Sequence, residues 1–135
     1  MKELHLSHIM KREVKISEAE WGVMGVVWRE APVTAKRILE AIGHRRDWTL
    51  ATVRTLLRRL CDKGALEWSK QGKRYLYHPL LTAEECVRQE SESFADRVLD
   101  KAPFASLLHM VERADLSKKD IQELRRVLRA KEGKQ

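Results

Sequence analysis

Residues 49–79 read TLATVRTLLRRLCDKGALEWSKQGKRYLYHP, and this stretch decides the fold. Thr49 can cap a helix over 50–63 that Gly64 ends, and an apolar stripe runs along one side of that helix. Two short alternating segments then flank a Gln-Gly-Lys turn at 71–73, a pattern typical of a two-stranded hairpin. The stretch therefore predicts an amphipathic helix followed by a small hairpin with a basic tip.

Two further helices are predicted before this stretch. Ser17 and Glu20 form a capping box at the start of a helix over about 18–29. A shorter helix is expected over 35–42 and is stopped by Gly43. Three short helices followed by a hairpin is the order of elements in a winged helix-turn-helix domain. The predicted fold class is mainly α with a small β-hairpin.

The rest of the chain is predicted to be helical, with segments that start near Thr82, Pro103 and Ser117. These segments carry many apolar positions and have no other core to cover. A second copy of the chain is the simplest partner, so we expect a homodimer closed by residues 82–131. The candidate dimerisation residues are Val98, Leu99, Phe104, Leu107, Leu108, Val111, Ile121, Leu124 and Leu128.

The net positive charge is confined to the first part of the chain. Residues 1–81 contain 16 Lys and Arg against 9 Asp and Glu, whereas residues 82–135 contain 11 of each, so the whole net charge of +7 lies in the first part. An anionic partner such as DNA is expected for so basic a region. We therefore predict a flexible arm at 1–15, a winged-helix DNA-binding domain at 16–81 and a helical dimerisation domain at 82–135.

The polar face of the 50–63 helix has the residue types that read DNA. Arginine pairs bidentately with guanine, and threonine can contact a thymine methyl group or a phosphate. A solvated face is the alternative for such a helix alone, but the preceding helix and the following hairpin favour DNA binding. Thr52, Arg54 and Thr55 are the expected base readers, and phosphate contacts are expected from Arg58, Arg59, Arg45, Arg46, Lys70, Lys73 and Arg74.

Other classes of protein are disfavoured. The sequence shows no nucleophile–base arrangement, phosphate-binding glycine loop or metal-ligand cluster, so neither an enzyme nor a bound cofactor is expected. A protein-interaction module would be expected to have a neutral or acidic third helix. Cys61 and Cys86 are the only cysteines and give no disulfide framework, which fits the reducing cytoplasm. No run approaches the ~18 apolar residues of a membrane span.

Three segments of the chain resemble the penicillinase-repressor family (BlaI/MecI/CopY), which includes the methicillin-resistance and copper-transport repressors. They are ISEAEWGVMGVVW at 16–28, DWTLATVRTLLRRLCDKGALEWSKQGKRYLYHPLLTAEE at 47–85 and SKKDIQELRRVL at 117–128. The resemblance covers about residues 16–130. It implies a homodimeric repressor with an N-terminal winged helix on a palindromic operator. By position, Thr52, Arg54 and Thr55 match the family's recognition-helix motif, and Arg59 matches a basic position further along the helix.

The sequence departs from the β-lactam-responsive branch of this family at two places. Ala51 stands where those repressors have a longer polar residue, so a different operator sequence is expected. Those repressors are cut by a sensor protease at an Asn-Phe bond, and the comparable stretch here has His109, Met110 and Val111. These three residues are the candidate proteolytic switch, with a sensor protease as the partner.

The sequence also departs from the copper-responsive branch. Those relatives end in paired Cys-x-Cys motifs, whereas no cysteine follows Cys86 in this sequence, so that copper switch is expected to be absent. The alternative function is a metal-responsive regulator of copper homeostasis that uses a non-family metal site. Such a site would have to be built from Cys61, Cys86 and scattered histidines.

Overall fold

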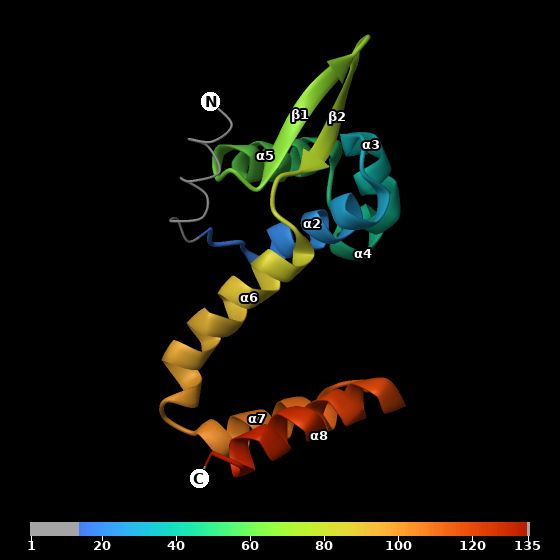
Figure 1. Ribbon diagram of the computed structural model, residues 1–135. Helices are drawn as coiled ribbons and strands as arrows, with labels where there is room; N and C mark the ends of the chain where they lie inside the picture. Colours follow the sequence, from blue (N-terminus) through green and yellow to red (C-terminus); the bar gives the residue numbers. More distant parts are fainter. Residues whose placement is uncertain (1–13, 135) are drawn as a thin grey trace, which may run out of the picture. The chain divides into compact units, whose positions relative to one another are not determined.

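The computed structural model describes residues 14–134, apart from the side chain of Leu99, and the chain divides into two compact units at Ser93–Phe94 (Figure 1). The first unit contains α2 (Glu18–Glu30), α3 (Ala35–Ile38), a π-helical turn (Leu39–Gly43), α4 (His44–Arg46), α5 (Leu50–Asp62), β1 (Leu66–Gln71), β2 (Arg74–Pro79) and α6 (Ala83–Phe94) except for its last residue. The second contains a π-helical turn (Ala95–Leu99), α7 (Pro103–Arg113) and α8 (Lys118–Glu132).

Helices α2 and α5 and the base of the hairpin share one apolar core. The predicted starts of both helices are confirmed: Ser17 and Glu20 form the capping box of α2, and the Thr49 hydroxyl accepts a hydrogen bond from the backbone N–H of Thr52. Burying one aliphatic side chain of this size stabilises a fold by about 1.5–3 kcal/mol. The fully buried side chains include Val23, Met24, Val26, Val27, Ile38, Val53, Leu57, Leu60 and Leu66.

The second helix differs from its prediction. It does not stop at Gly43: after α3 the backbone widens into a π-helical turn and continues through α4 to Arg46. Gly43 has right-handed helical angles, and a Cβ atom there would lie 2.3 Å from a methyl carbon of Leu39. Gly43 is therefore required for close packing and not as a helix stop. The helix ends instead at Asp47, which has a φ of 55°.

The predicted hairpin is confirmed. β1 and β2 pair antiparallel from Leu66–Pro79 to Gln71–Arg74, and Gly72 has a φ of 64° in the connecting turn. Val33, which precedes α3, forms an isolated antiparallel bridge with Tyr77 of β2. The bridge joins the hairpin to the start of the helix-turn-helix, so these two elements are held together.

The first unit extends beyond residue 81, where the sequence placed the boundary between the two domains. Trp28 donates its indole N–H to the carbonyl of Leu81 at 2.9 Å, and Cys86 in α6 is buried in the core. The boundary between the two compact units therefore falls after Ser93. The boundary between a DNA-binding domain and a dimerisation domain stays a prediction. Most of the arm expected at 1–15 lies outside the described residues. Its last two residues do not: Val14 is buried, and the carbonyl of Lys15 accepts a hydrogen bond.

The second unit has almost no core of its own. From residue 100 to 134 every described side chain is exposed except those of Ser106 and Leu116, which are half-buried. The apolar residues of α7 nevertheless follow a helical period at positions 104, 107, 108 and 111. None of the helices within residues 14–134 is both long and apolar enough to cross a membrane.

An ion pair holds the end of α5 against the start of α2. The ammonium group of Lys63 donates to the buried carboxylate of Glu20 at 2.5 Å and to the carbonyl of Lys15 at 2.7 Å. Burial acts to raise the pKa of Glu20, but the hydrogen bonds from Lys63 and Ser17 outweigh it and hold this pKa below its ordinary value of 4.5. The charged form of Glu20 therefore stabilises the fold.

Replacing Glu20 with alanine is expected to lower the free energy of unfolding by about 2 kcal/mol, because it removes both the ion pair and half of the capping box. Urea unfolding at pH 7 measures this loss. The wild type should also lose stability as the pH falls below about 4.5 toward the lower folded-state pKa of Glu20, and Glu20→Gln should lose less over that range. Glu18→Ala removes an exposed carboxylate from the same turn and is the control; an equal effect of both variants would contradict this role.

Candidate DNA-binding surface

The exposed face of α5 carries the residues predicted to read DNA. Val53, Leu56, Leu57 and Leu60 turn inward, which leaves Arg54, Thr55, Arg58 and Arg59 exposed and Thr52 half-buried. Leu50, expected on the inward stripe, is only half-buried. The packing of α5 against α2 thus brings the predicted residues of this helix onto one surface.

The threonine hydroxyl groups of α5 make hydrogen bonds within the protein, whereas its exposed arginine side chains make none in the described part of the chain. The Thr52 hydroxyl lies 3.1 Å from that of Thr49, and the Thr55 hydroxyl donates to the carbonyl of Ala51 at 3.0 Å. Within residues 14–134, the side chains of Arg54, Arg58 and Arg59 form no hydrogen bond or ion pair. Arg54 is therefore the free cation closest to the N-terminal end of the helix, where side chains best reach base edges.

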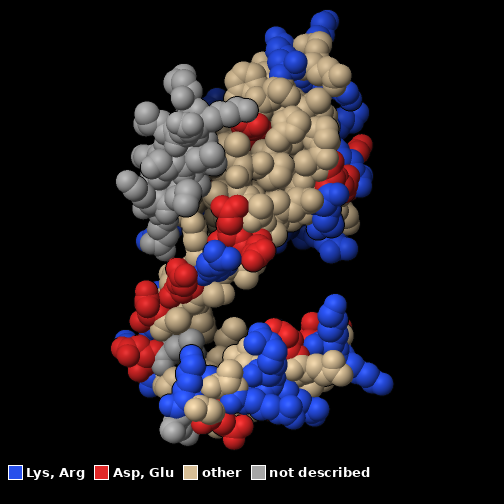
Figure 2. All heavy atoms as spheres, in the orientation of Figure 1, with Lys and Arg blue, Asp and Glu red and all other residues tan. Residues whose placement is uncertain are grey.

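The hairpin tip is the second basic region. Lys70, Lys73 and Arg74 are all exposed there, and Figure 2 shows Lys and Arg atoms covering the tip. Trp68 and Tyr75 pack edge to face at 5.2 Å below it, and the Lys70 ammonium group lies over the Tyr75 ring. Such a tip can contact the DNA backbone with little sequence information.

The structure places Arg45 and Arg46 in α4 and not in an open turn. Both are exposed, but the guanidinium group of Arg46 lies over the Trp48 ring and against Gly22 of α2, where an added Cβ would be 3.3 Å away. Arg46 therefore packs α4 onto α2. Its contact with phosphate stays a prediction, as does that of Arg45.

A cavity of about 400 Å³ lies between α3, the start of α5 and β2. Arg54, Lys73 and Arg74, which were predicted from the sequence, line it together with Lys36 of α3, which was not. Lys36 was missed because α3 is too short for its periodicity to show which side faces the hairpin. Tyr77 also lines the cavity, and burial raises the pKa of its hydroxyl group, which therefore stays protonated at neutral pH.

The metal-responsive alternative gains no support from the side chains. Within residues 14–134 there is no group of three or more His, Cys, Asp and Glu residues that could hold a metal ion. Burial raises the pKa of the Cys61 thiol and that of the Cys86 thiol, the latter to about 11. Both thiols are therefore protonated at neutral pH in the metal-free protein.

The residues of the candidate proteolytic switch lie within α7. Met110 and Val111 are 51% and 46% exposed, and His109 is also exposed, but all three have helical backbone. A protease needs an extended substrate, so cleavage there would require α7 to open locally. The cleavage site stays a prediction.

Together, the helices before α5, its exposed basic face and the two-stranded wing define a winged helix-turn-helix protein of the kind that binds DNA. The family model described as penicillinase repressor matches residues 16–130. The chain belongs to this family, as its resemblance predicted.

Individual relatives agree with this assignment. The methicillin resistance regulatory protein MecI of Mammaliicoccus sciuri is 39% identical over 118 residues, which cover 87% of this chain and 95% of MecI. The penicillinase repressor of Bacillus licheniformis is 30% identical over 119 residues, or 88% of this chain and 93% of the relative. The solution structure of the DNA-binding domain of the repressor BlaI has a TM-score of 0.50 and 31% identity, and covers 56% of this chain and 92% of that domain.

Proposed function

We propose that this protein is a transcriptional repressor that binds a palindromic DNA operator as a homodimer. Helix α5 lies in the major groove of each half-site, and the wing contacts the backbone. The observation that carries this function is the set of exposed arginines on α5 that have no partner in the described chain, on a winged-helix fold that shares a family with known repressors. No cofactor or catalytic step is needed for it, and it acts in the cytoplasm, where operator DNA lies.

The homodimer is supported by the apolar residues of the second unit. Phe104 is 74% exposed and Leu128 is 59% exposed, although both belong to amphipathic helices. Soluble monomers do not usually leave so many apolar side chains in water, and a second copy of the same surface covers them symmetrically. The other exposed apolar side chains there are Leu107, Leu108, Met110, Val111, Ile121, Leu124 and Val127. A two-fold dimer predicts half-sites separated by about 10 base pairs or a multiple of it.

The test is the affinity of the purified protein for its own upstream intergenic DNA and for a scrambled duplex of equal length, at several salt concentrations. Specific binding should be about 10³-fold or more tighter than binding to the scrambled duplex, and both affinities should fall steeply with salt. Equal, weak binding to both duplexes would mean that this DNA contains no operator, and a genomic binding selection that also recovers none would refute the repressor function.

Removal of the wing cations should weaken all DNA binding alike. Lys73→Ala and Arg74→Ala together are expected to reduce the affinity for operator and scrambled duplexes by the same factor, because phosphate contacts carry no base information. The slope of log affinity against log salt should fall by about two for each protomer, since each cation that contacts the phosphate backbone contributes about one to this slope. A loss confined to the operator would instead mean that the wing reads bases.

A further inference from the structure

Backbone hydrogen bonds join two walls of the cavity between α3, α5 and β2. The bridge between Val33 and Tyr77 pairs the backbone N–H of each residue with the carbonyl of the other, at 3.3 and 2.8 Å. The Thr34 hydroxyl caps α3 by accepting the backbone N–H of Arg37 at 3.1 Å. These hydrogen bonds join the segment before α3 to β2, which supply two of the walls of the cavity.

The charges around this cavity are all of one sign. Lys36, Arg54, Lys73 and Arg74 line it, and none of its described lining residues is Asp or Glu. The cavity is open to solvent and also has aromatic walls from Tyr75 and Tyr77. Four cations with no counter-charge attract an anion, and the open side admits one that belongs to a long chain.

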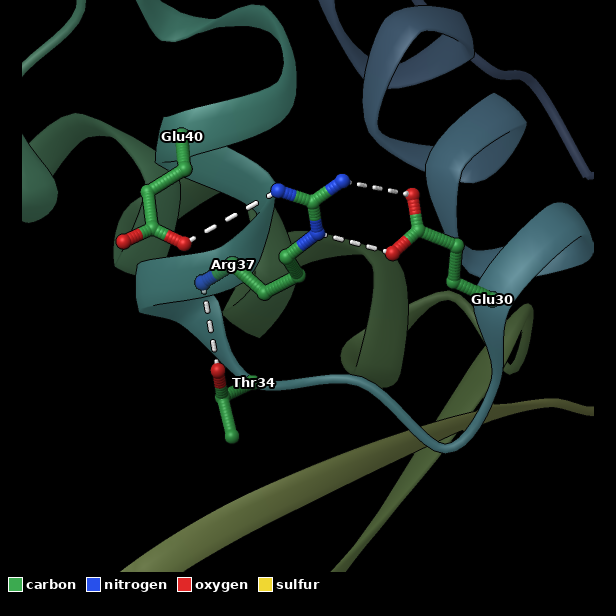
Figure 3. A network of polar contacts seen from close by, with 4 residues as sticks. All are labelled: Glu30, Thr34, Arg37 and Glu40. Carbon is green, nitrogen blue, oxygen red and sulfur yellow. Dashed lines mark hydrogen bonds and ion pairs between the residues drawn. The ribbon is translucent and has the colours of Figure 1, made fainter.

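Lys36 and Arg37 are neighbours in α3, but only Arg37 is paired with carboxylates of the described chain. Arg37 is bound by the Glu30 carboxylate at 2.8 Å and lies 3.9 Å from Glu40, so its charge is neutralised within the protein (Figure 3). The side chain of Lys36 is exposed and makes no hydrogen bond or ion pair in the part of the chain that the structure describes. Lys36 is therefore the cation of α3 that is available at the cavity.

We propose that this cavity holds one backbone phosphate of the bound duplex, contacted by Lys36 from α3 on one side and by Lys73 and Arg74 from the wing on the other. The inference rests on the proposed function and deepens it, because it states where a DNA strand crosses the protein. The strand runs between α3 and the wing, and its phosphate stands next to Arg54. Lys36 is thus a DNA-binding residue that positions α5 without reading a base.

Two other features support a phosphate as the occupant. Tyr77 lines the cavity, and a tyrosine hydroxyl group is a neutral donor from which a phosphate oxygen can accept a hydrogen bond. A phosphodiester is also the anion that α5 must approach in any major-groove complex, because the groove is bordered by the two backbones. A phosphate bound in the cavity would therefore fix the position of the wing on the DNA backbone together with the position of α5 in the major groove.

The first experiment compares Lys36→Ala with the wild type on the operator and on a scrambled duplex. Affinity is expected to fall about tenfold on both duplexes, and the salt slope should fall by about one for each protomer. Lys118→Ala removes an exposed lysine from α8 and is the charge-matched control, which should change neither quantity. Lys36→Arg retains the cation and should restore the salt slope. An unchanged slope in Lys36→Ala would overturn the proposal.

The second experiment identifies the phosphate. Operator duplexes are made with one neutral methylphosphonate linkage at each backbone position in turn. One position per half-site should weaken wild-type binding about tenfold and weaken Lys36→Ala less, because one of the cations that contact that phosphate is already absent. Equal sensitivity of both proteins at every position would overturn the proposal.

A third measurement separates DNA phosphate from a small anion. Inorganic phosphate is added at constant ionic strength to the protein–operator complex. No specific displacement is expected, because a single phosphate competes poorly with a polyanionic duplex. Tight binding of inorganic phosphate to the DNA-free wild type, lost in Lys36→Ala, with no effect of Lys36→Ala on DNA affinity, would assign the cavity to a free anion and overturn the proposal. If Arg54→Ala loses operator binding while Lys36→Ala binds normally, this inference alone fails; if the wild type selects no operator, the proposed function fails with it.

Discussion

Arg54→Ala is expected to reduce strongly the discrimination between the operator and a scrambled duplex. Arg54 is exposed, has no hydrogen-bonding or ionic partner within residues 14–134, and lies one turn from the N-terminal end of α5. A bidentate contact from arginine to guanine discriminates by about 1–3 kcal/mol, or roughly 5- to 150-fold per half-site, and a dimer loses two such contacts. Binding titrations of both duplexes at one salt concentration measure the ratio of affinities.

The control is Arg88→Ala, which removes an exposed arginine of α6 that pairs with Glu84 four residues away. This variant should keep the full operator preference. Thermal unfolding should be nearly unchanged in both proteins, because neither side chain is buried. If Arg54→Ala instead reduced the affinity for both duplexes by the same factor, Arg54 would be a phosphate contact and the base readers would have to be Thr52 and Thr55.

Leu124→Asp is expected to convert the dimer into monomers. Leu124 is 39% exposed in α8, on the same stripe as Ile121 and Leu128. If two copies bury this stripe against each other, the variant places two unpaired carboxylates in an apolar interface, which should weaken association at least 100-fold. Sedimentation velocity at micromolar concentration measures the state of assembly. Operator affinity should fall by a similar factor, because each monomer then holds one half-site.

Gln122→Asp is the matched control, since it adds the same charge to the opposite, polar face of α8. It should leave both the dimer and operator binding intact. A Leu124→Asp protein that stays dimeric would place the dimer interface elsewhere. A wild type that is monomeric at all accessible concentrations would contradict the homodimer itself.

The sequence by itself determined the elements whose signals are local. The capping residues Ser17 and Thr49 predicted the starts of α2 and α5, and the period of the apolar residues in α5 predicted which of its side chains point outward. The Gln-Gly-Lys turn likewise predicted the hairpin within the observed strands. These features depend on hydrogen bonds and contacts between residues a few positions apart, so their pattern is visible in one chain read from end to end.

The tertiary structure alone decided which cations are free and which distant residues meet. Gly43 looked like a helix stop, but packing against Leu39 makes it a point of close approach within a continuing helix. Arg46 and Arg37 look as available as Lys36 in the sequence, yet one packs on Trp48 and the other pairs with Glu30. Lys36 lines a cavity with the wing, and the nearby Val33–Tyr77 bridge joins segments 44 residues apart. Such pairings follow from how the elements pack in space, which no local pattern along the chain encodes.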